Sequence, residues 1–163
     1  MNYTFSSKHN AIDAHEMATS EYNKYGMYSF KLSGKIFHAV STYEHKLNFI
    51  NDITRERGIN IDLYINVLEH LIGDNFELGG GFNLSKNTVT LVVSLSGTEI
   101  MDKNKLKNIM ETYGFSYSNM VDLFNKFHGS EEETVKSIKS VAIEVSKNGV
   151  ENITWFVDVP RGS

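Results

Sequence analysis

The sequence predicts an α+β domain in which an antiparallel sheet of two hairpins plus a C-terminal strand has helices packed on one face. Two stretches, residues 30–45 and 82–97, each read as a pair of strands around a turn. Each stretch is followed by apolar residues at helical spacing, and the chain closes with the apolar run of residues 152–159. No segment rich in proline, glycine or serine divides the chain, so we expect a single domain over residues 1–158.

Both predicted hairpins turn at residues that tolerate a positive φ, at Gly34-Lys35 and at Lys86-Asn87. Strand alternation then divides the strands into a core-facing set and an outward set. The core-facing set is Val89, Leu91 and Val93, with Phe37 and Ala39 in the first hairpin. The outward set is His38, Val40, Thr42, Thr90, Val92 and Ser94, joined by Lys31 and Asn83. We therefore predict a sheet face of mixed polarity that is open to a partner or a ligand.

The two stretches also predict an internal repeat of strand–strand–helix–helix units, at about residues 27–73 and 79–129. When Phe30 is placed over Phe82 and four residues are inserted in the second copy, the glycines that would end the helices coincide. These pairs are Gly58 with Gly114 and Gly73 with Gly129. Few residues are identical between the copies, so chance similarity is the alternative explanation.

The remaining segments are predicted as two helices and a buried strand. Residues 9–25 and 131–147 carry apolar residues at helical spacing, and Ser130 with Glu133 forms a capping box at the start of the second helix. The C-terminal strand is apolar on both faces, which is typical of a strand covered on both sides. Residues 159–163 resemble a thrombin-site linker and are interpreted as a cloning remnant.

Composition excludes several classes of function. The 163 residues include no cysteine, which rules out disulfides, cysteine-ligated zinc, iron–sulfur clusters and thiol catalysis. The net charge of −4 makes nucleic acid an unfavourable partner, because nucleic-acid binders carry basic patches. The N-terminus shows no signal peptide, and no apolar run approaches the ~18 residues of a membrane span. We therefore expect a cytoplasmic protein without a membrane partner.

No catalytic or metal-binding constellation is recognisable among the six histidines. His9 and His15 are six residues apart, a spacing that does not share a helix face. The glycine-rich residues 79–85 lack the Gly-Lys-Ser/Thr ending of a phosphate-binding loop and precede a strand. We therefore predict no catalytic residue, no metal and no cofactor. An enzyme that uses His38 or His15 as acid or base is the third interpretation of the function.

The leading interpretation is a non-catalytic module that binds another protein. Small, mildly acidic chains without catalytic residues are typical of immunity proteins and of phage proteins that inhibit a host defence enzyme, and also of many unrelated proteins. The predicted contact surface is the open sheet face or an acidic rim. The rim consists of Glu131, Glu132 and Glu133, and Asp74 and Glu77 would extend it. The candidate binding residues are Lys31, His38, Thr42, Thr90, Ser94, Glu131, Glu132 and Glu133.

Two further binding functions remain as alternatives. The runner-up is a small-ligand or nucleotide binder with its site between the two repeat halves, where Lys31, Lys35 and His38 would face phosphate. A nucleic-acid binder ranks last, behind the enzyme. It would use a basic stripe on the helices that follow the two hairpins, but solvated helix faces explain these charges more simply. The stripe residues are Arg55, Arg57, Lys103, Lys105 and Lys107.

Overall fold

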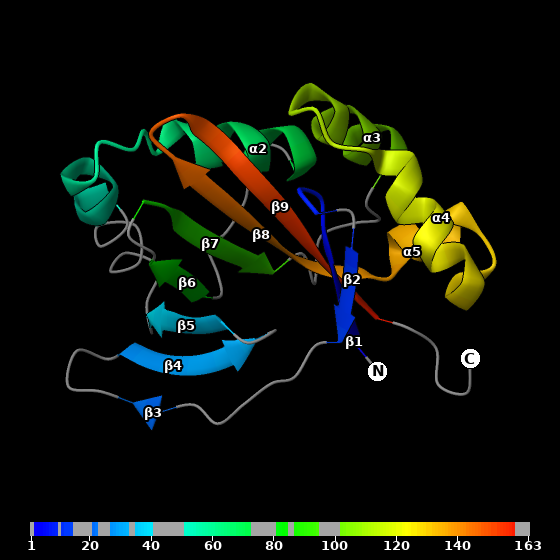
Figure 1. Ribbon diagram of the computed structural model, residues 1–163, viewed down its shortest axis with the longest axis horizontal. Helices are drawn as coiled ribbons and strands as arrows, with labels where there is room; N and C mark the ends of the chain where they lie inside the picture. The colour runs from blue at the N-terminus through cyan, green and yellow to red at the C-terminus, as the bar shows by residue number, and fades with distance from the viewer. Residues whose placement is uncertain are drawn as a thin grey trace.

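A nine-stranded, fully antiparallel sheet forms the body of the protein, with strand order β2-β1-β9-β8-β7-β6-β5-β4-β3. The computed structural model describes residues 2–9, 11–14, 21–22, 27–32, 35–40, 51–72, 81–84, 87–94 and 102–158 (Figure 1). The predicted α+β class is confirmed, with helices packed against an antiparallel sheet.

The strands run over most of the chain, and the helices lie between and after the two central hairpins. The strands are β1 Asn2–Ser6, β2 Ala11–Ala14, β3 Glu21–Tyr22, β4 Met27–Leu32, β5 Lys35–Val40, β6 Gly81–Leu84, β7 Val89–Ser94, β8 Ile138–Ser146 and β9 Gly149–Asp158. The helices are α2 Asp62–Ile72, α3 Lys103–Thr112, α4 Tyr117–His128 and α5 Glu131–Lys136. Residues 51–56 are also helical.

One sheet face and the helices share the main hydrophobic core. The predicted core-facing residues of β7 are buried there, with exposed fractions of 1% for Val89, 4% for Leu91 and 0% for Val93. The largest side chain in this core, Trp155 of β9, has no exposed surface. The hydroxyl of Tyr64 in α2 donates a hydrogen bond to the carbonyl of Val89, which ties α2 to β7. Burial of this single apolar face therefore holds helices and sheet together.

The second face of the central strands is also buried, which corrects the prediction of an open sheet face. Val92, Ala142 and Phe156 form a second cluster with exposed fractions of 7%, 3% and 7%. The neighbouring polar side chains Thr4 and Thr90 are 4% and 5% exposed. The sequence predicted correctly that the C-terminal strand is covered on both sides. The alternation that separated Thr90 and Val92 from the core-facing residues was correct, and the error lay in taking the face opposite the core as open.

The predicted helix at residues 131–147 is wrong beyond its first turns. The N-cap is confirmed, because the Ser130 hydroxyl accepts a hydrogen bond from the Glu133 amide at 3.2 Å. However, α5 ends at Lys136 and β8 begins at Ile138. The apolar residues of this segment fit both a helical period and strand alternation, and β-branched side chains favour the strand. Lys147-Asn148 then forms the two-residue hairpin turn into β9, whose first residue Gly149 pairs with Ser146.

The N-terminal helix predicted at residues 9–25 is also wrong. Within this segment the structure has the strands β2 and β3, at opposite ends of the sheet. The alanine spacing that suggested a helix gives only a weak preference, and pairing of β2 with β1 decides the structure.

Both predicted hairpins are confirmed as β4–β5 and β6–β7, and they are adjacent in the sheet. The final strand β9 does not join them directly, because β8 lies between β9 and β7. The internal repeat stays a prediction. Gly58 and Gly114 have the expected positive φ, +70° and +78°. The hairpin loops differ, since Leu32 pairs with Lys35 whereas Leu84 pairs with Val89.

Burial of the second sheet face predicts a large stability cost when Phe156 is replaced. Phe156→Ala should lower the free energy of unfolding by about 3 kcal/mol, because a buried aromatic ring is removed and leaves a cavity. Urea unfolding measures this loss. The control is Thr154→Ala, a half-buried neighbour on the same face of the same strand, for which we expect a loss below about 1 kcal/mol. Equal effects of the two variants would contradict burial of this face.

Candidate functional site

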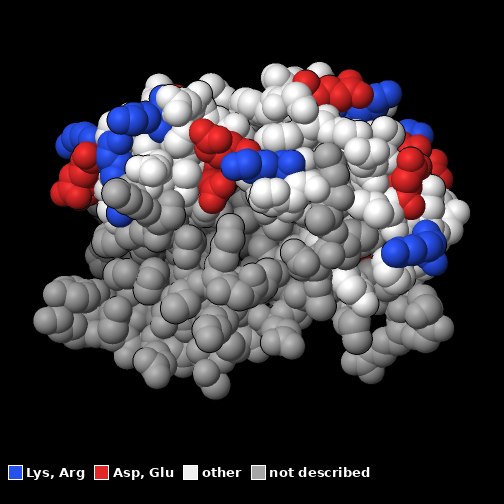
Figure 2. All heavy atoms as spheres, viewed as in Figure 1, with Lys and Arg blue, Asp and Glu red and all other residues white. Residues whose placement is uncertain are grey.

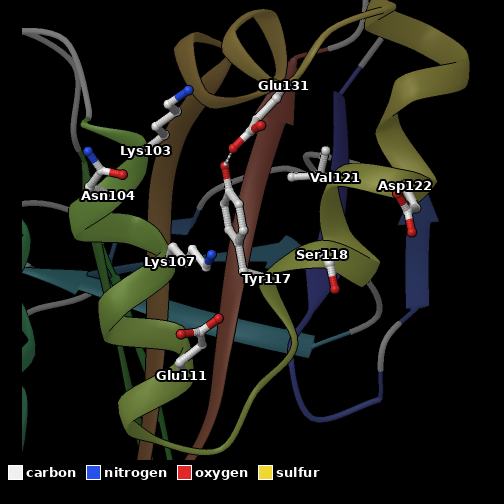
Figure 3. A pocket seen from close by; sticks show the side chains of 9 residues that line it. All are labelled: Lys103, Asn104, Lys107, Glu111, Tyr117, Ser118, Val121, Asp122 and Glu131. Atoms are coloured by element: carbon white, nitrogen blue, oxygen red, sulfur yellow. Dashed lines mark hydrogen bonds between the residues drawn. The ribbon is translucent and has the colours of Figure 1, made fainter.

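A groove of about 440 Å³ lies between α3, α4 and the start of α5 (Figure 3). Helix α3 supplies one wall, α4 the other, and Glu131 of α5 closes one end. The lining residues are Lys103, Asn104, Lys107, Glu111, Tyr117, Ser118, Val121, Asp122 and Glu131. This concave feature is lined by described residues throughout, and it is our candidate site.

The sequence places polar side chains in the groove because the opposite side of each helix is anchored in the core. In α3, Leu106, Ile109 and Met110 are buried, so Lys103 and Lys107, one turn apart, are left on the outer face. The same division applies to α4, where Tyr117, Met120, Val121 and Phe124 are buried while Ser118 and Asp122 are exposed.

Both helices that line the groove start at defined caps. The Asp102 carboxylate accepts a hydrogen bond from the Asn104 amide at 2.8 Å, and the Ser116 hydroxyl accepts one from the Asn119 amide at 3.2 Å. Gly114, with φ of +78°, lies between the helices and permits the chain to reverse. The groove walls are therefore fixed at the ends where they meet.

The centre of the groove is a hydrogen-bonded pair. The Tyr117 hydroxyl donates to Oε1 of Glu131 at 2.5 Å, which links the first residue of α4 to the first residue of α5 (Figure 3). Burial, this hydrogen bond and the negative charge of Glu131 all raise the pKa of Tyr117. The phenol therefore stays protonated at neutral pH and acts as a donor, whereas a general base would need a lowered pKa.

Charges around the groove are only partly neutralised. Lys103 lies 3.9 Å from Glu132, and Lys136 lies 4.0 Å from Glu133; all four side chains are well exposed, so these pairs contribute little to stability. Lys107 and Asp122 make no ion pair with any of the described residues. On the face in Figure 2, charges of both signs are interspersed over the described residues.

His128 lies at the C-terminal end of α4, next to α5. Its Nε2 atom is buried and has no hydrogen-bond partner, and its ring centroid lies 6.2 Å from that of Phe124. Burial lowers the pKa of His128, against the opposing effects of a hydrogen bond to the backbone of Asp158 and the charge of Glu133. A neutral imidazole is therefore favoured where α4, α5 and β9 meet.

The structure describes the side chains of four of the eight predicted binding residues, namely Thr90, Glu131, Glu132 and Glu133. Glu131 lines the groove, and Glu132 and Glu133 are exposed beside it. Thr90 is buried at 5% exposure and is therefore inaccessible to a partner. Of Lys31, His38 and Ser94, the structure describes only the strand backbone. Thr42, Asp74 and Glu77 lie outside the described residues.

The strand register does not support the predicted alignment of His38 with Thr90. His38 pairs with Phe82, and Phe82 pairs with Leu91. Thr90 instead pairs with Asn83. Directly opposed residues in antiparallel strands share a face. The register therefore places His38 in line with Leu91. The alternation was correct within β7, where Val89, Leu91 and Val93 are buried, and the register between the two hairpins was not visible in the sequence.

Sequence reasoning missed most of the groove. Lys103 and Lys107 were considered only as part of a basic stripe that also included Lys105, and Tyr117 was not among the candidate binding residues. The spacing of four between the two lysines did indicate a shared helix face. Nothing in the sequence indicated that Asp122 of α4 would lie across from them.

Comparisons with known proteins give no assignment. The chain matches no protein-family model, no curated protein sequence and no solved structure. Within the described ranges, no helix is long and apolar enough to cross a membrane. The same residues contain no group of three or more histidine, aspartate or glutamate side chains arranged to hold a metal ion. The function therefore has to be argued from the groove and its surroundings.

The central pair of the groove predicts a hydroxyl-specific stability effect. Tyr117→Phe should lower the free energy of unfolding by about 1 kcal/mol, because the hydrogen bond to Glu131 is lost while the carboxylate still reaches water. Glu131→Gln should cost less, since its amide oxygen still accepts from Tyr117. The control is Tyr113→Phe, whose hydroxyl makes no hydrogen bond to the described residues. Urea unfolding that gave equal losses for Tyr117→Phe and Tyr113→Phe would refute the pair's contribution.

The lowered pKa of His128 predicts a loss of stability in mild acid. The unfolded chain binds a proton at this residue below about pH 6.5, before the folded protein does, so unfolding becomes more favourable as the pH falls. His128→Gln should reduce the difference in unfolding free energy between about pH 7.5 and about pH 5.5. His70→Gln is the control, because His70 is exposed on α2. Identical pH profiles for wild type and His128→Gln would show that this residue does not titrate as argued.

Proposed function

We propose that this protein works by binding another protein, and that the surface formed by α3, α4 and α5 makes the contact. The observation that carries the proposal is the groove with exposed carboxylates at one end. Glu131 belongs to the groove, while Glu132 and Glu133 extend from the same first turn of α5 into solvent. We call Glu131, Glu132 and Glu133 the acidic rim.

The acidic rim is favourable for a basic partner. The three carboxylates lie in the first turn of α5, where the partial positive charge of the helix N-terminus is favourable for them. Glu132 and Glu133 have only exposed ion pairs with Lys103 and Lys136, which a partner's lysine or arginine can displace at small cost. Charge complementarity of this kind accelerates association and restricts the choice of partner.

The proposed mechanism is steric or electrostatic blocking of the partner. No step of it needs a proton transfer or a metal, and Tyr117 is held as a hydrogen-bond donor rather than as a base. An inhibitor, such as an immunity protein or a phage anti-defence protein, is the form of this function that the small, mildly acidic, cysteine-free chain favours.

The alternative is a small-ligand or nucleotide binder. Its support is the groove volume of about 440 Å³, which falls in the usual range of ligand sites. The lining is less favourable for phosphate, since three carboxylates face two lysines. The groove also lies within residues 103–131 rather than between the proposed repeat halves, and Lys31, Lys35 and His38 do not line it.

The test compares two variants that lose the same charge. Glu132→Gln/Glu133→Gln removes two rim carboxylates, and Glu56→Gln/Glu69→Gln removes two exposed carboxylates elsewhere. Wild type and both variants serve as bait in lysate of the source organism or its natural host, with mass spectrometry of captured proteins. For the captured partner, the rim variant should associate about tenfold more slowly and with a weaker salt dependence, and the control variant should match wild type.

Two results would reject the proposal. One is the absence of a stoichiometric protein partner for wild type, and the other is equal association rates for the rim and control variants. A rise in melting temperature with nucleotides in a thermal-shift screen, in the absence of any partner, would favour the small-ligand alternative.

A further inference from the structure

We infer that the groove receives a peptide segment of the partner, one that carries an acidic side chain toward Lys107 and a basic side chain toward Asp122. This inference rests on the proposed protein-binding function and specifies the kind of surface that the partner presents. It concerns the groove between α3 and α4, whereas the acidic rim lies at its end.

Three charged side chains that line the groove make no ion pair with any described residue, namely Lys107 and Glu111 on α3 and Asp122 on α4. Lys103 is engaged with Glu132, and Glu131 accepts the Tyr117 hydrogen bond. In Figure 3 the Lys107 side chain points from α3 toward Tyr117, while Asp122 lies on the α4 side. The groove therefore presents unpaired charges of both signs to an occupant.

The floor between these charges is apolar and fixed. It consists of Tyr117 and Val121, which are 6% and 9% exposed. Tyr117 is held by Glu131, and the helices on both sides start at hydrogen-bonded caps. A preformed floor of this kind reduces the conformational entropy that is lost on binding.

These features favour a peptide over a multiply charged anion. A phosphate-bearing ligand at Lys107 would also face Glu111, Asp122 and Glu131 in the same groove. A polypeptide segment with both an acidic and a basic side chain satisfies Lys107 and Asp122 together. It also continues directly onto the acidic rim, because Glu131 belongs to both surfaces. Charge complementarity therefore selects a segment of mixed charge.

The absence of cysteine from the chain makes a site-specific test possible. Ser118→Cys places one thiol on an exposed groove position, and Glu69→Cys places one on the exposed face of α2. Each variant is labelled with a benzophenone maleimide, incubated with the lysate used for capture and irradiated. Peptide mass spectrometry then identifies the partner segment that is joined to the label.

The expected result is a crosslink from Ser118→Cys, and not from Glu69→Cys, to a partner segment with acidic and basic residues within a few positions of each other. Lys107→Glu in the Ser118→Cys background should reduce the crosslink by about tenfold or more, since it replaces attraction by repulsion. Lys105→Glu is the matched control, because this exposed lysine is on the same helix and does not line the groove.

The possible failures are distinguishable. If capture depends on the acidic rim but Lys107→Glu and Lys105→Glu crosslink equally, the groove inference is overturned and the binding function stands. A crosslinked segment with charges of only one sign also overturns the inference. If wild type captures no partner, the proposed function fails and the inference fails with it. Thermal unfolding of both lysine variants checks that each one folds.

Discussion

The structure depends on the burial of β9 on both of its faces. One face of this strand places Trp155 in the main core, and the other places Phe156 in the second cluster. The strand also pairs with β1 on one side and β8 on the other, so it joins the two ends of the chain. The Trp155 indole donates a hydrogen bond to the Ser7 hydroxyl at 3.2 Å, which satisfies the polar atom of the buried ring.

The position of the groove depends on contacts between its helices and the strands β1 and β9. Phe124 of α4 lies with its ring centroid 6.5 Å from that of Phe5 in β1, which pairs with β9. The Asp158 amide at the end of β9 donates to the carbonyl of Ser137, the residue that joins α5 to β8, at 2.9 Å. Helices α4 and α5 are thus anchored to the same end of the sheet. A change in β9 packing would be transmitted to the groove through these contacts.

Short capped turns set the relative orientation of the three groove helices. Helix α4 ends at Gly129, whose φ of +76° terminates it, and Ser130 immediately caps α5. With only these two residues between the helices, the carboxylate of Glu131 has little freedom relative to Tyr117. The groove is therefore a product of turn chemistry as well as of packing.

The sequence predicted the parts of the fold that local patterns determine. Helices α3 and α4, the caps at Ser130 and Gly114, and both central hairpins follow from spacing and turn residues. Helix prediction failed at β8 because Ile138, Val141 and Val145 fit a helical stripe as well as a strand. Only the long-range pairing of β8 with β7 and β9 separates the two structures, and no local pattern contains that information.

The same distinction explains how much of the candidate site could be predicted. Residues 131–133 were identified because three consecutive glutamates after a serine cap are a local feature. The groove was not identified because Lys107 and Asp122 are brought together by the packing of two helices. Thr90 was assigned to an open face because strand alternation places it opposite the core-facing residues, and alternation alone does not show that the second face is also buried.

Under the proposed binding function, the acidic rim and the groove contribute to different stages of recognition. The rim charges are exposed to water, so their main effect is on long-range attraction and hence on the association rate. The groove has a rigid floor with charges of opposite sign on its walls, so its contacts form only after docking and act on the dissociation rate. A partner of the wrong charge pattern would leave Lys107 or Asp122 desolvated and unpaired, which disfavours the complex. The groove would therefore determine which partner binds, and the adjoining acidic rim would increase the association rate.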